Sequence, residues 1–247
     1  MLIYGHRGAR GEAPENTLAG FHRAISAGVS RVELDLRLSR DGQLVVIHDD
    51  TVNRTTNGRG AVAHLTAAEL ARLDARRGAP DCATPQPIPT IARVLEEFPQ
   101  IVHFQLEAKP VSAIQRTFMA ERLAQLFAQF QLYQRATVTS FDAHLLRELG
   151  ASDARVPRGL VTDRTRPDPM SLALELGVGM LVLHWKLCTP ARIATAHAGG
   201  IRVSAWTVNE EKVVRRLHGH GIDSVVTDYP TRMMALSLSL QDAQPEV

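Results

Sequence analysis

The sequence has no long apolar run and very few cysteines. No stretch of about 18 consecutive apolar residues occurs in the 247 residues, so no membrane-spanning helix is expected. Met1 to Gly5 already has the pattern of a strand, without a basic and apolar leader before it, so we expect no secretory signal and a cytoplasmic location. Cys82 and Cys188 are too few for a disulfide framework or a thiolate metal site.

A strong excess of charge of one sign is also missing. The 28 Lys and Arg residues nearly balance the 26 Asp and Glu residues, which leaves a formal net charge of +2. This balance gives no indication of a polyanionic partner, so we expect no nucleic acid. The chain is 45% hydrophobic and 22% charged, as in ordinary globular proteins, and its length allows one large domain or two small ones.

What the sequence does contain is a regular alternation of two kinds of segment. Short β-branched or aliphatic runs, typical of strands, lie at 2–4, 31–38, 102–107, 136–140, 159–162, 180–184, 201–206 and 224–227. Amphipathic segments with helical spacing lie at 17–27, 91–98, 112–130, 143–149, 169–176, 190–198 and 210–218. Eight such strands with helices between them favour a closed (β/α)₈ barrel, with a doubly wound open sheet as the alternative.

One region departs from this alternation. Asp41-Gly42 lies between two apolar runs, which predicts a hairpin whose second arm is Leu44 to Ile47. Residues 50–89 then lack the pattern, are rich in Thr, Arg, Gly and Pro, and hold one short helix candidate, Ala67 to Leu73. We therefore expect a single barrel domain over residues 1–247 with a small insertion subdomain at 50–89.

Acidic residues occupy one face of two predicted strands. Glu33 and Asp35 alternate with leucines on the second strand, and Glu107 alternates with apolar residues on the third. If the apolar faces pack against the helices, the three carboxylates point toward the barrel axis. Buried together they would repel one another, so a divalent cation is the simplest partner. Ligands that are all oxygen favour Mg²⁺, Ca²⁺ or Mn²⁺.

Basic and titratable side chains are expected around the same place. Lys109 follows Glu107 on the same strand face and Arg7 follows the first strand, and two fixed positive charges suit a phosphate group. His6 ends the first strand and His48 ends the hairpin arm. A histidine exchanges protons near neutral pH, so two of them on opposite sides of a phosphorus can serve as base and acid.

Several short motifs in this order resemble the glycerophosphodiester phosphodiesterase family, in its bacterial cytoplasmic form. They are His6-Arg7-Gly8, Pro14-Glu15-Asn16-Thr17, Glu33-Leu34-Asp35, Asp41-Gly42, His48-Asp49, Arg54-Thr55-Thr56, Leu106-Glu107-Ala108-Lys109, Trp206-Thr207-Val208-Asn209 and Thr227-Asp228-Tyr229-Pro230. The resemblance runs from residue 3 to about residue 232. A departure from the family pattern is Ala108, where a larger aliphatic residue is common.

The resemblance implies a metal-dependent barrel enzyme that splits small glycerophosphodiesters into sn-glycerol 3-phosphate and an alcohol. It implies the following roles: Glu33, Asp35 and Glu107 hold one divalent cation, His6 and His48 form the acid/base pair, and Arg7 and Lys109 contact the phosphate. The family carries a small extra subdomain at the position of residues 50–89, and here it is expected to line the alcohol side.

Other positions receive supporting roles from the resemblance. Glu15 is expected to orient the first loop or a histidine, and Asn16 to cap the first helix. Trp206 is expected to pack against the glycerol. His184 is a candidate for shaping the preference for the leaving group. Asp228 either supports the site or starts a turn. The remaining histidines are expected to be structural.

Two other functions stay open at this point. Lysophospholipase D chemistry on the same site would need an apolar groove, most naturally from the insertion, where the sequence shows no long apolar stretch. A noncatalytic sensor of phosphate ligands would be favoured by the loss of a histidine or a carboxylate, yet the full set is present. The sequence does not choose between water and the adjacent glycerol hydroxyl as the nucleophile, nor does it indicate an oligomeric state.

Overall fold

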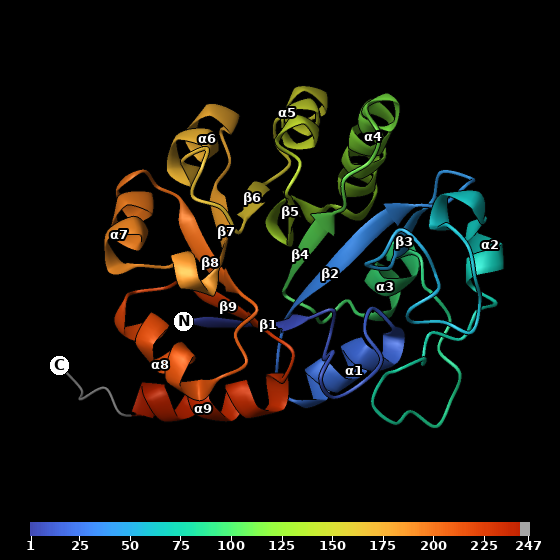
Figure 1. Ribbon diagram of the computed structural model, residues 1–247, viewed down its shortest axis with the longest axis horizontal. Helices are drawn as coiled ribbons and strands as arrows, with labels where there is room; N and C mark the ends of the chain where they lie inside the picture. The colour runs from blue at the N-terminus through green and yellow to red at the C-terminus, as the bar shows by residue number, and fades with distance from the viewer. Residues whose placement is uncertain (243–247) are drawn as a thin grey trace.

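The structure is a computed structural model that describes residues 1–242, and its centre is a ring of parallel strands (Figure 1). The ring consists of β1 (Leu2–His6), β2 (Arg31–Leu38), β4 (His103–Ala108), β5 (Ala136–Ser140), β6 (Arg158–Thr162), β7 (Met180–His184), β8 (Arg202–Trp206) and β9 (Ser224–Thr227). Strand β1 pairs with both β2 and β9, which closes the ring. The predicted (β/α)₈ barrel is therefore confirmed over the open-sheet alternative.

Helices surround this ring on the outside (Figure 1). They are α1 (Leu18–Ser26), α3 (Ile91–Glu97), α4 (Ala113–Phe130), α5 (Ala143–Ser152), α6 (Pro169–Leu176), α7 (Pro190–Ala198), α8 (Glu211–Gly219) and α9 (Pro230–Asp242). Their apolar faces cover the outward side chains of the strands, which form one large core. Among residues 1–242, no helix combines the length and apolar character needed to cross a membrane.

The strand register fixes which polar side chains lie at the same height in the barrel. Between β2 and β4, Glu33 is paired with Gln105 and Asp35 with Glu107. Between β1 and β2, His6 is paired with Glu33. Successive side chains of a strand point to opposite faces, so the fully buried Val32, Leu34 and Leu36 on β2 face the helices while the acidic residues face the axis.

The predicted hairpin is also present. Strand β3 (Leu44–Val46) runs antiparallel to β2, with Leu38 opposite Leu44, and Gly42 at the turn has a φ of +71° that favours glycine. The hairpin carries the chain outside the ring and places His48 after the short strand. It thereby leads from the barrel directly into the insertion.

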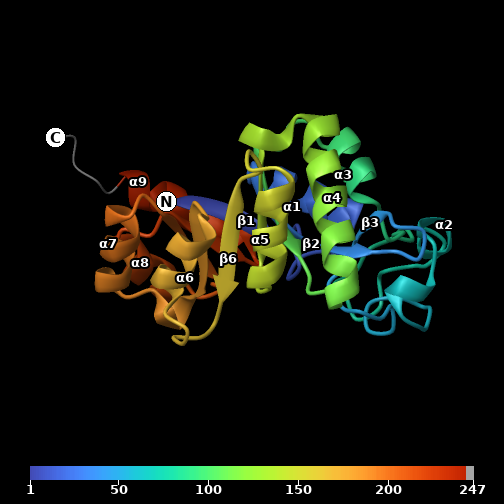
Figure 2. The same cartoon turned by 90° about the horizontal axis from the view of Figure 1, so that it is seen from above.

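The insertion projects from one end of the molecule (Figure 2). It contains the 3₁₀ turn η1 (Val62–His64) and helix α2 (Ala67–Leu70), which is shorter than the predicted 67–73. Seven side chains form a small separate core: Val45, Ile47, Val52, Val62, Leu70, Ala75 and Ile88. The insertion therefore has its own packing, even though it contains little regular structure.

The first helix begins differently from the expectation. Thr17, not Asn16, is the N-cap of α1: its backbone is extended, and its Oγ1 accepts a hydrogen bond of 3.1 Å from the Gly20 amide. Asn16 has a left-handed backbone, with a φ of 57°, and its side chain turns toward the barrel axis instead. The prediction that Asn16 caps the helix is wrong, because an N-cap residue requires an extended backbone.

Candidate active site

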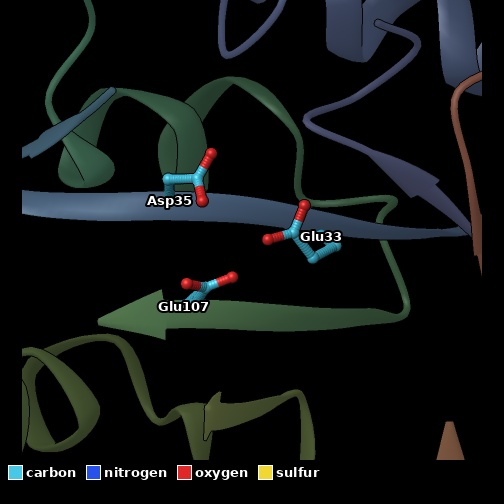
Figure 3. A group of neighbouring side chains, drawn as sticks. All are labelled: Glu33, Asp35 and Glu107. Atoms are coloured by element: carbon cyan, nitrogen blue, oxygen red, sulfur yellow. The ribbon is translucent and has the colours of Figure 1, made fainter. Parts of the chain in front are cut away.

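The three predicted carboxylates meet at the axis side of two neighbouring strands. Glu33 and Asp35 come from β2 and Glu107 from β4, and Figure 3 shows their carboxyl groups turned toward one another. One oxygen from each lies within 4.8 Å of the others. Glu33 is 5% exposed and Asp35 is fully buried. The strand register that pairs Asp35 with Glu107 brings them together.

Two basic side chains contact this cluster. Lys109 Nζ lies 2.7 Å from Asp35 Oδ1 and also contacts Glu107 Oε1, while Arg7 Nε lies 3.1 Å from Asp35 Oδ2. The Arg7 backbone amide donates a 3.1 Å hydrogen bond to Glu33 Oε2. Two fixed positive charges therefore face three acidic groups, so the cluster stays one positive charge short when all three are ionised.

The pKa values of the carboxyl groups reflect this shortage. Burial would raise the pKa of Asp35, but Lys109 and Arg7 together hold it well below its usual range. Burial, followed by the charge of Asp35, raises the pKa of Glu33, and burial also raises the pKa of Glu107. Among residues 1–242, Glu33 Oε1 is a buried oxygen without a hydrogen-bond partner. An additional cation would satisfy this oxygen and relieve the repulsion.

The donor set therefore fits a divalent metal ion. Every candidate ligand atom is a carboxylate oxygen, which is the preference of hard ions such as Mg²⁺, Ca²⁺ and Mn²⁺ rather than of zinc. The cluster alone is compatible with any of these three ions.

His6 lies beside the carboxylates and is held by a fourth acidic residue. Its Nδ1 lies 2.6 Å from Asp228 Oδ1, and its Nε2 lies 3.8 Å from Glu33 Oε2. Asn209 Nδ2 donates a 2.7 Å hydrogen bond to the other oxygen of Asp228. Burial lowers the pKa of His6. Of the two alternatives left open for Asp228, the structure favours support of the site.

His48 is held in a similar way after the hairpin. Its Nδ1 lies 2.7 Å from Asp49 Oδ1, and its backbone carbonyl accepts a 2.7 Å hydrogen bond from Arg37 Nε. The His48 side chain is 34% exposed, and partial burial lowers its pKa. The Ile47 amide donates a 3.1 Å hydrogen bond to the Asp35 carbonyl, which places the next residue, His48, beside the carboxylate cluster.

Glu15 and Asn16 support the site from the loop between β1 and α1. Glu15 accepts a 2.8 Å hydrogen bond from Arg7 Nη1 and two more from Arg54. Burial alone would raise the pKa of Glu15, but Arg54 and Arg7 together lower it to about 2. Its bonds hold the first loop rather than a histidine. Asn16 Nδ2 donates to Asp35 Oδ2 at 2.8 Å, a role that the motif did not predict.

Trp206 lies at the end of β8 and lines a small cavity together with His6, Glu33 and Glu107. Its indole Nε1 donates to the Val182 carbonyl at 3.2 Å, which fixes the ring plane. The ring of His184 meets Trp206 edge-on with centroids 5.8 Å apart. His184 therefore contacts this cavity only indirectly, by packing against Trp206.

A second aromatic residue was missed by the sequence reasoning. Phe141, directly after β5, lies edge-on to Trp206 with centroids 5.5 Å apart, and it is 41% exposed. The position of Phe141 directly after a predicted strand could have identified it as a site residue, because the loops that follow barrel strands build such sites.

The fold and site together define a (β/α)₈-barrel protein with acidic residues and two carboxylate-bound histidines at the carboxyl ends of its first strands. The sequence matches the glycerophosphoryl diester phosphodiesterase family over residues 6–232. The chain belongs to this family.

Similarity to individual proteins extends over nearly the whole chain. A glycerophosphodiester phosphodiesterase of Bacillus altitudinis is 30% identical over 237 residues, which cover 95% of this chain and 97% of that protein. One from Caldanaerobacter subterraneus subsp. tengcongensis is 29% identical over 238 residues, with the same coverage of 95% and 97%. A phosphodiesterase of Oleispira antarctica, solved in complex with the product sn-glycerol-3-phosphate, has a TM-score of 0.84 at 27% identity, with 96% of each chain covered.

Proposed function

We propose that this chain hydrolyses glycerophosphodiesters to sn-glycerol 3-phosphate and an alcohol at the carboxylate cluster, with one divalent cation as cofactor. The observation that carries the proposal is the combination of three acidic side chains within 4.8 Å and two histidines whose Nδ1 atoms are each bound to a carboxylate. The product bound in the Oleispira relative supports the choice of substrate class.

Glu33, Asp35 and Glu107 would hold the cation. When bound there, a divalent cation withdraws electron density from phosphate oxygens and stabilises the charge that develops during attack on phosphorus. Arg7 and Lys109 are already fixed against the cluster, at 3.1 Å and 2.7 Å from Asp35. We propose that Arg7 and Lys109 neutralise the remaining negative charge of the phosphate, because preorganised cations need no rearrangement as charge builds up.

His6 and His48 form the acid/base pair in this proposal. An ionised carboxylate at Nδ1 can only accept a hydrogen bond, so in the neutral ring it favours the tautomer with the proton on Nδ1 and the lone pair on Nε2. One histidine begins as the neutral ring and takes the proton of the attacking hydroxyl through Nε2, while the other begins doubly protonated and delivers its Nε2 proton to the departing alkoxide. Asp228 and Asp49 stabilise each ring while it is positively charged.

The remaining parts of the site bind the two halves of the substrate. Trp206, held against Val182, offers its ring to the glycerol half, and the insertion at 50–89 lines the side of the alcohol. We further propose that residues 1–247 act as one catalytic domain that includes this insertion. The class of alcohol accepted is then set by the insertion and by His184.

No observation favours lysophospholipase D chemistry as the main activity. The apolar side chains of the insertion are used in its own small core, as with Val52 and Leu70, which are fully buried. Within residues 1–242, no large exposed hydrophobic residue lies between positions 50 and 89. The insertion therefore offers no apolar groove of the kind that an acyl chain requires. A noncatalytic sensor would have no need of both carboxylate-bound histidines.

The direct test is release of glycerol 3-phosphate from glycerophosphocholine, with and without Mg²⁺ and with a chelator. We expect release that requires the ion, and a rate reduced by about 10²-fold or more in His6→Ala and His48→Ala. A search for a cyclic glycerophosphate during the same reaction distinguishes direct attack by water from a route through the adjacent glycerol hydroxyl, because either route places one solvent oxygen in the final glycerol 3-phosphate. Wild-type rates in both histidine variants would refute the assigned acid/base pair.

A further inference from the structure

Arg54 joins the insertion to the active site, although the mechanism above gives it no role. It lies in the motif Arg54-Thr55-Thr56, at the start of the insertion. Its neighbours anchor it firmly: Val52 and Thr56 are fully buried, and Thr56 Oγ1 donates a 2.7 Å hydrogen bond to the Val52 carbonyl. The backbone that carries Arg54 is therefore fixed, while its side chain extends toward the barrel.

The guanidinium group of Arg54 binds two carboxylates at once. Nε and Nη2 donate to Asp49 Oδ2 and Oδ1 at 2.7 Å and 3.0 Å. Nη1 and Nη2 donate to Glu15 Oε2 and Oε1 at 2.9 Å and 2.8 Å. Each carboxylate is thus held by two parallel bonds, the geometry in which arginine gives both strength and fixed orientation.

Each of these carboxylates is also bound to a residue of the candidate site. Asp49 Oδ1 lies 2.7 Å from His48 Nδ1, and Glu15 Oε1 accepts a 2.8 Å bond from Arg7 Nη1. The Arg54 guanidinium holds the pKa of Asp49 well below its usual range, so the carboxylate is ionised and can only accept a hydrogen bond. The proton of the neutral His48 ring then belongs on Nδ1, and Nε2 is left to exchange protons.

An isolated ion pair at the surface would have little effect, because solvent screens it and its side chains are mobile. Arg54 differs from this case. Its side chain is 43% exposed, but Glu15 is only 11% exposed and Asp49 27%. One partly exposed guanidinium therefore orients two more protected carboxylates, and a loss of Arg54 leaves Asp49 free to turn away from His48.

We propose that Arg54 is a positioning residue that holds the Asp49 carboxylate against His48 Nδ1 and, through Glu15, couples the insertion to Arg7. This inference rests on the proposed acid/base role of His48. It gives the insertion a part in the proton-transfer machinery in addition to its contacts with the alcohol.

The test compares Arg54→Ala and Arg54→Lys with Arg155→Ala as the matched control. Arg155 also binds one carboxylate through a fork, with Nε and Nη2 3.0 Å and 2.9 Å from the two oxygens of Asp153, but it lies before β6, outside the insertion and the candidate site. We expect kcat for glycerophosphocholine to fall by about 10- to 100-fold in Arg54→Ala, the range found when a residue that orients a functional histidine is removed. KM should change much less, and Arg155→Ala should match the wild type.

Arg54→Lys should recover only part of the lost rate, because a lysine keeps the charge but cannot bind both carboxylates through a fork. Because the site of the missing side chain is partly open to solvent, millimolar guanidinium should raise the rate of Arg54→Ala. Methylammonium at the same concentration should raise the rate of this variant much less. Circular dichroism and thermal melting establish that each variant is folded.

A second readout does not depend on turnover. Nitrogen-15 NMR of the imidazole rings reports which nitrogen of His48 carries the proton. We expect the Nδ1–H form in the wild type and in Arg155→Ala, and a mixture of the two tautomers in Arg54→Ala. A folded Arg54→Ala variant with wild-type kcat, or with the His48 tautomer unchanged, would overturn the proposal. If the wild type shows no activity toward glycerophosphodiesters, the proposed function fails, while the tautomer measurement still decides whether Arg54 positions His48.

Discussion

Replacement of Asp228 by asparagine tests the role of His6 with very little change in shape. In the structure, Asp228 Oδ1 faces His6 Nδ1 at 2.6 Å, and Oδ2 accepts a hydrogen bond from Asn209 Nδ2 at 2.7 Å. In the Asp228→Asn variant the new amide oxygen should stay with Asn209, because that partner is a donor. The new amide nitrogen then faces His6 Nδ1 as a donor, which forces the ring proton onto Nε2.

The expected effect has two parts. A charge-assisted hydrogen bond contributes about 1.5–3 kcal/mol, so its loss from the protonated ring costs about 10- to 100-fold in rate. The wrong tautomer adds to this, and the comparable change in a serine protease triad lowers kcat by about 10⁴-fold. We therefore expect kcat of Asp228→Asn to fall by about 10²- to 10⁴-fold.

The assay is initial-rate release of glycerol 3-phosphate, with kcat and KM measured separately. The chain offers a matched control in a second His–Asp pair, since His197 Nε2 lies 2.8 Å from Asp223 Oδ2 outside the candidate site. Asp223→Asn should keep the wild-type kcat. A folded Asp228→Asn variant within threefold of the wild-type rate would refute the account of His6.

Further predictions concern the support of the site and the stability of the fold. Thr17→Ala should lower the free energy of unfolding by about 1 kcal/mol in urea titrations, because it removes the cap of α1. Asn16→Ala should instead reduce activity, because it removes the hydrogen bonding of Asn16 to Asp35. Burial, then the charges of Arg202 and Arg31, lower the pKa of His103 to about 4. In the unfolded chain His103 has a pKa near 6.5 and therefore binds a proton before the folded chain does. The free energy of unfolding should then fall as the pH drops from 6.5 toward 4. This fall should be weaker in His103→Gln, and the same pH dependence in the variant would contradict the assignment to His103. Burial raises the pKa of the Cys188 thiol to about 12, so it should resist thiol reagents until the protein is unfolded, and rapid labelling of the native protein would count against this.

The barrel and the carboxylate cluster followed from local sequence patterns. The alternation of Glu33, Leu34, Asp35 and Leu36 specifies one polar and one apolar face, and the parallel register with β4 then brings Glu107 beside Asp35. The hairpin was similarly local, because Asp41-Gly42 encodes its own turn. Such features are predictable because the residues that create them are neighbours in the sequence or on adjacent strands.

The supporting contacts were less predictable, because they depend on partners far apart in the chain. His6 and Asp228 are separated by 222 positions, and Arg54 and Glu15 by 39. Asn16 was misassigned as a helix cap because the sequence does not specify the left-handed backbone, with a φ of 57°, that turns its side chain to Asp35. The motifs contained all of these residues, but only the folded chain shows which side chains they meet.

The proposed role of Glu33, Asp35 and Glu107 is to hold one divalent cation. Isothermal titration of the metal-free chain with Mg²⁺, Mn²⁺ and Ca²⁺, followed by assay of the same samples, measures this directly. We expect that at least one of these ions binds with one ion per chain and restores the activity, and that Glu107→Gln weakens this binding. An absence of binding by all three ions, together with full activity in the presence of chelator, would contradict it.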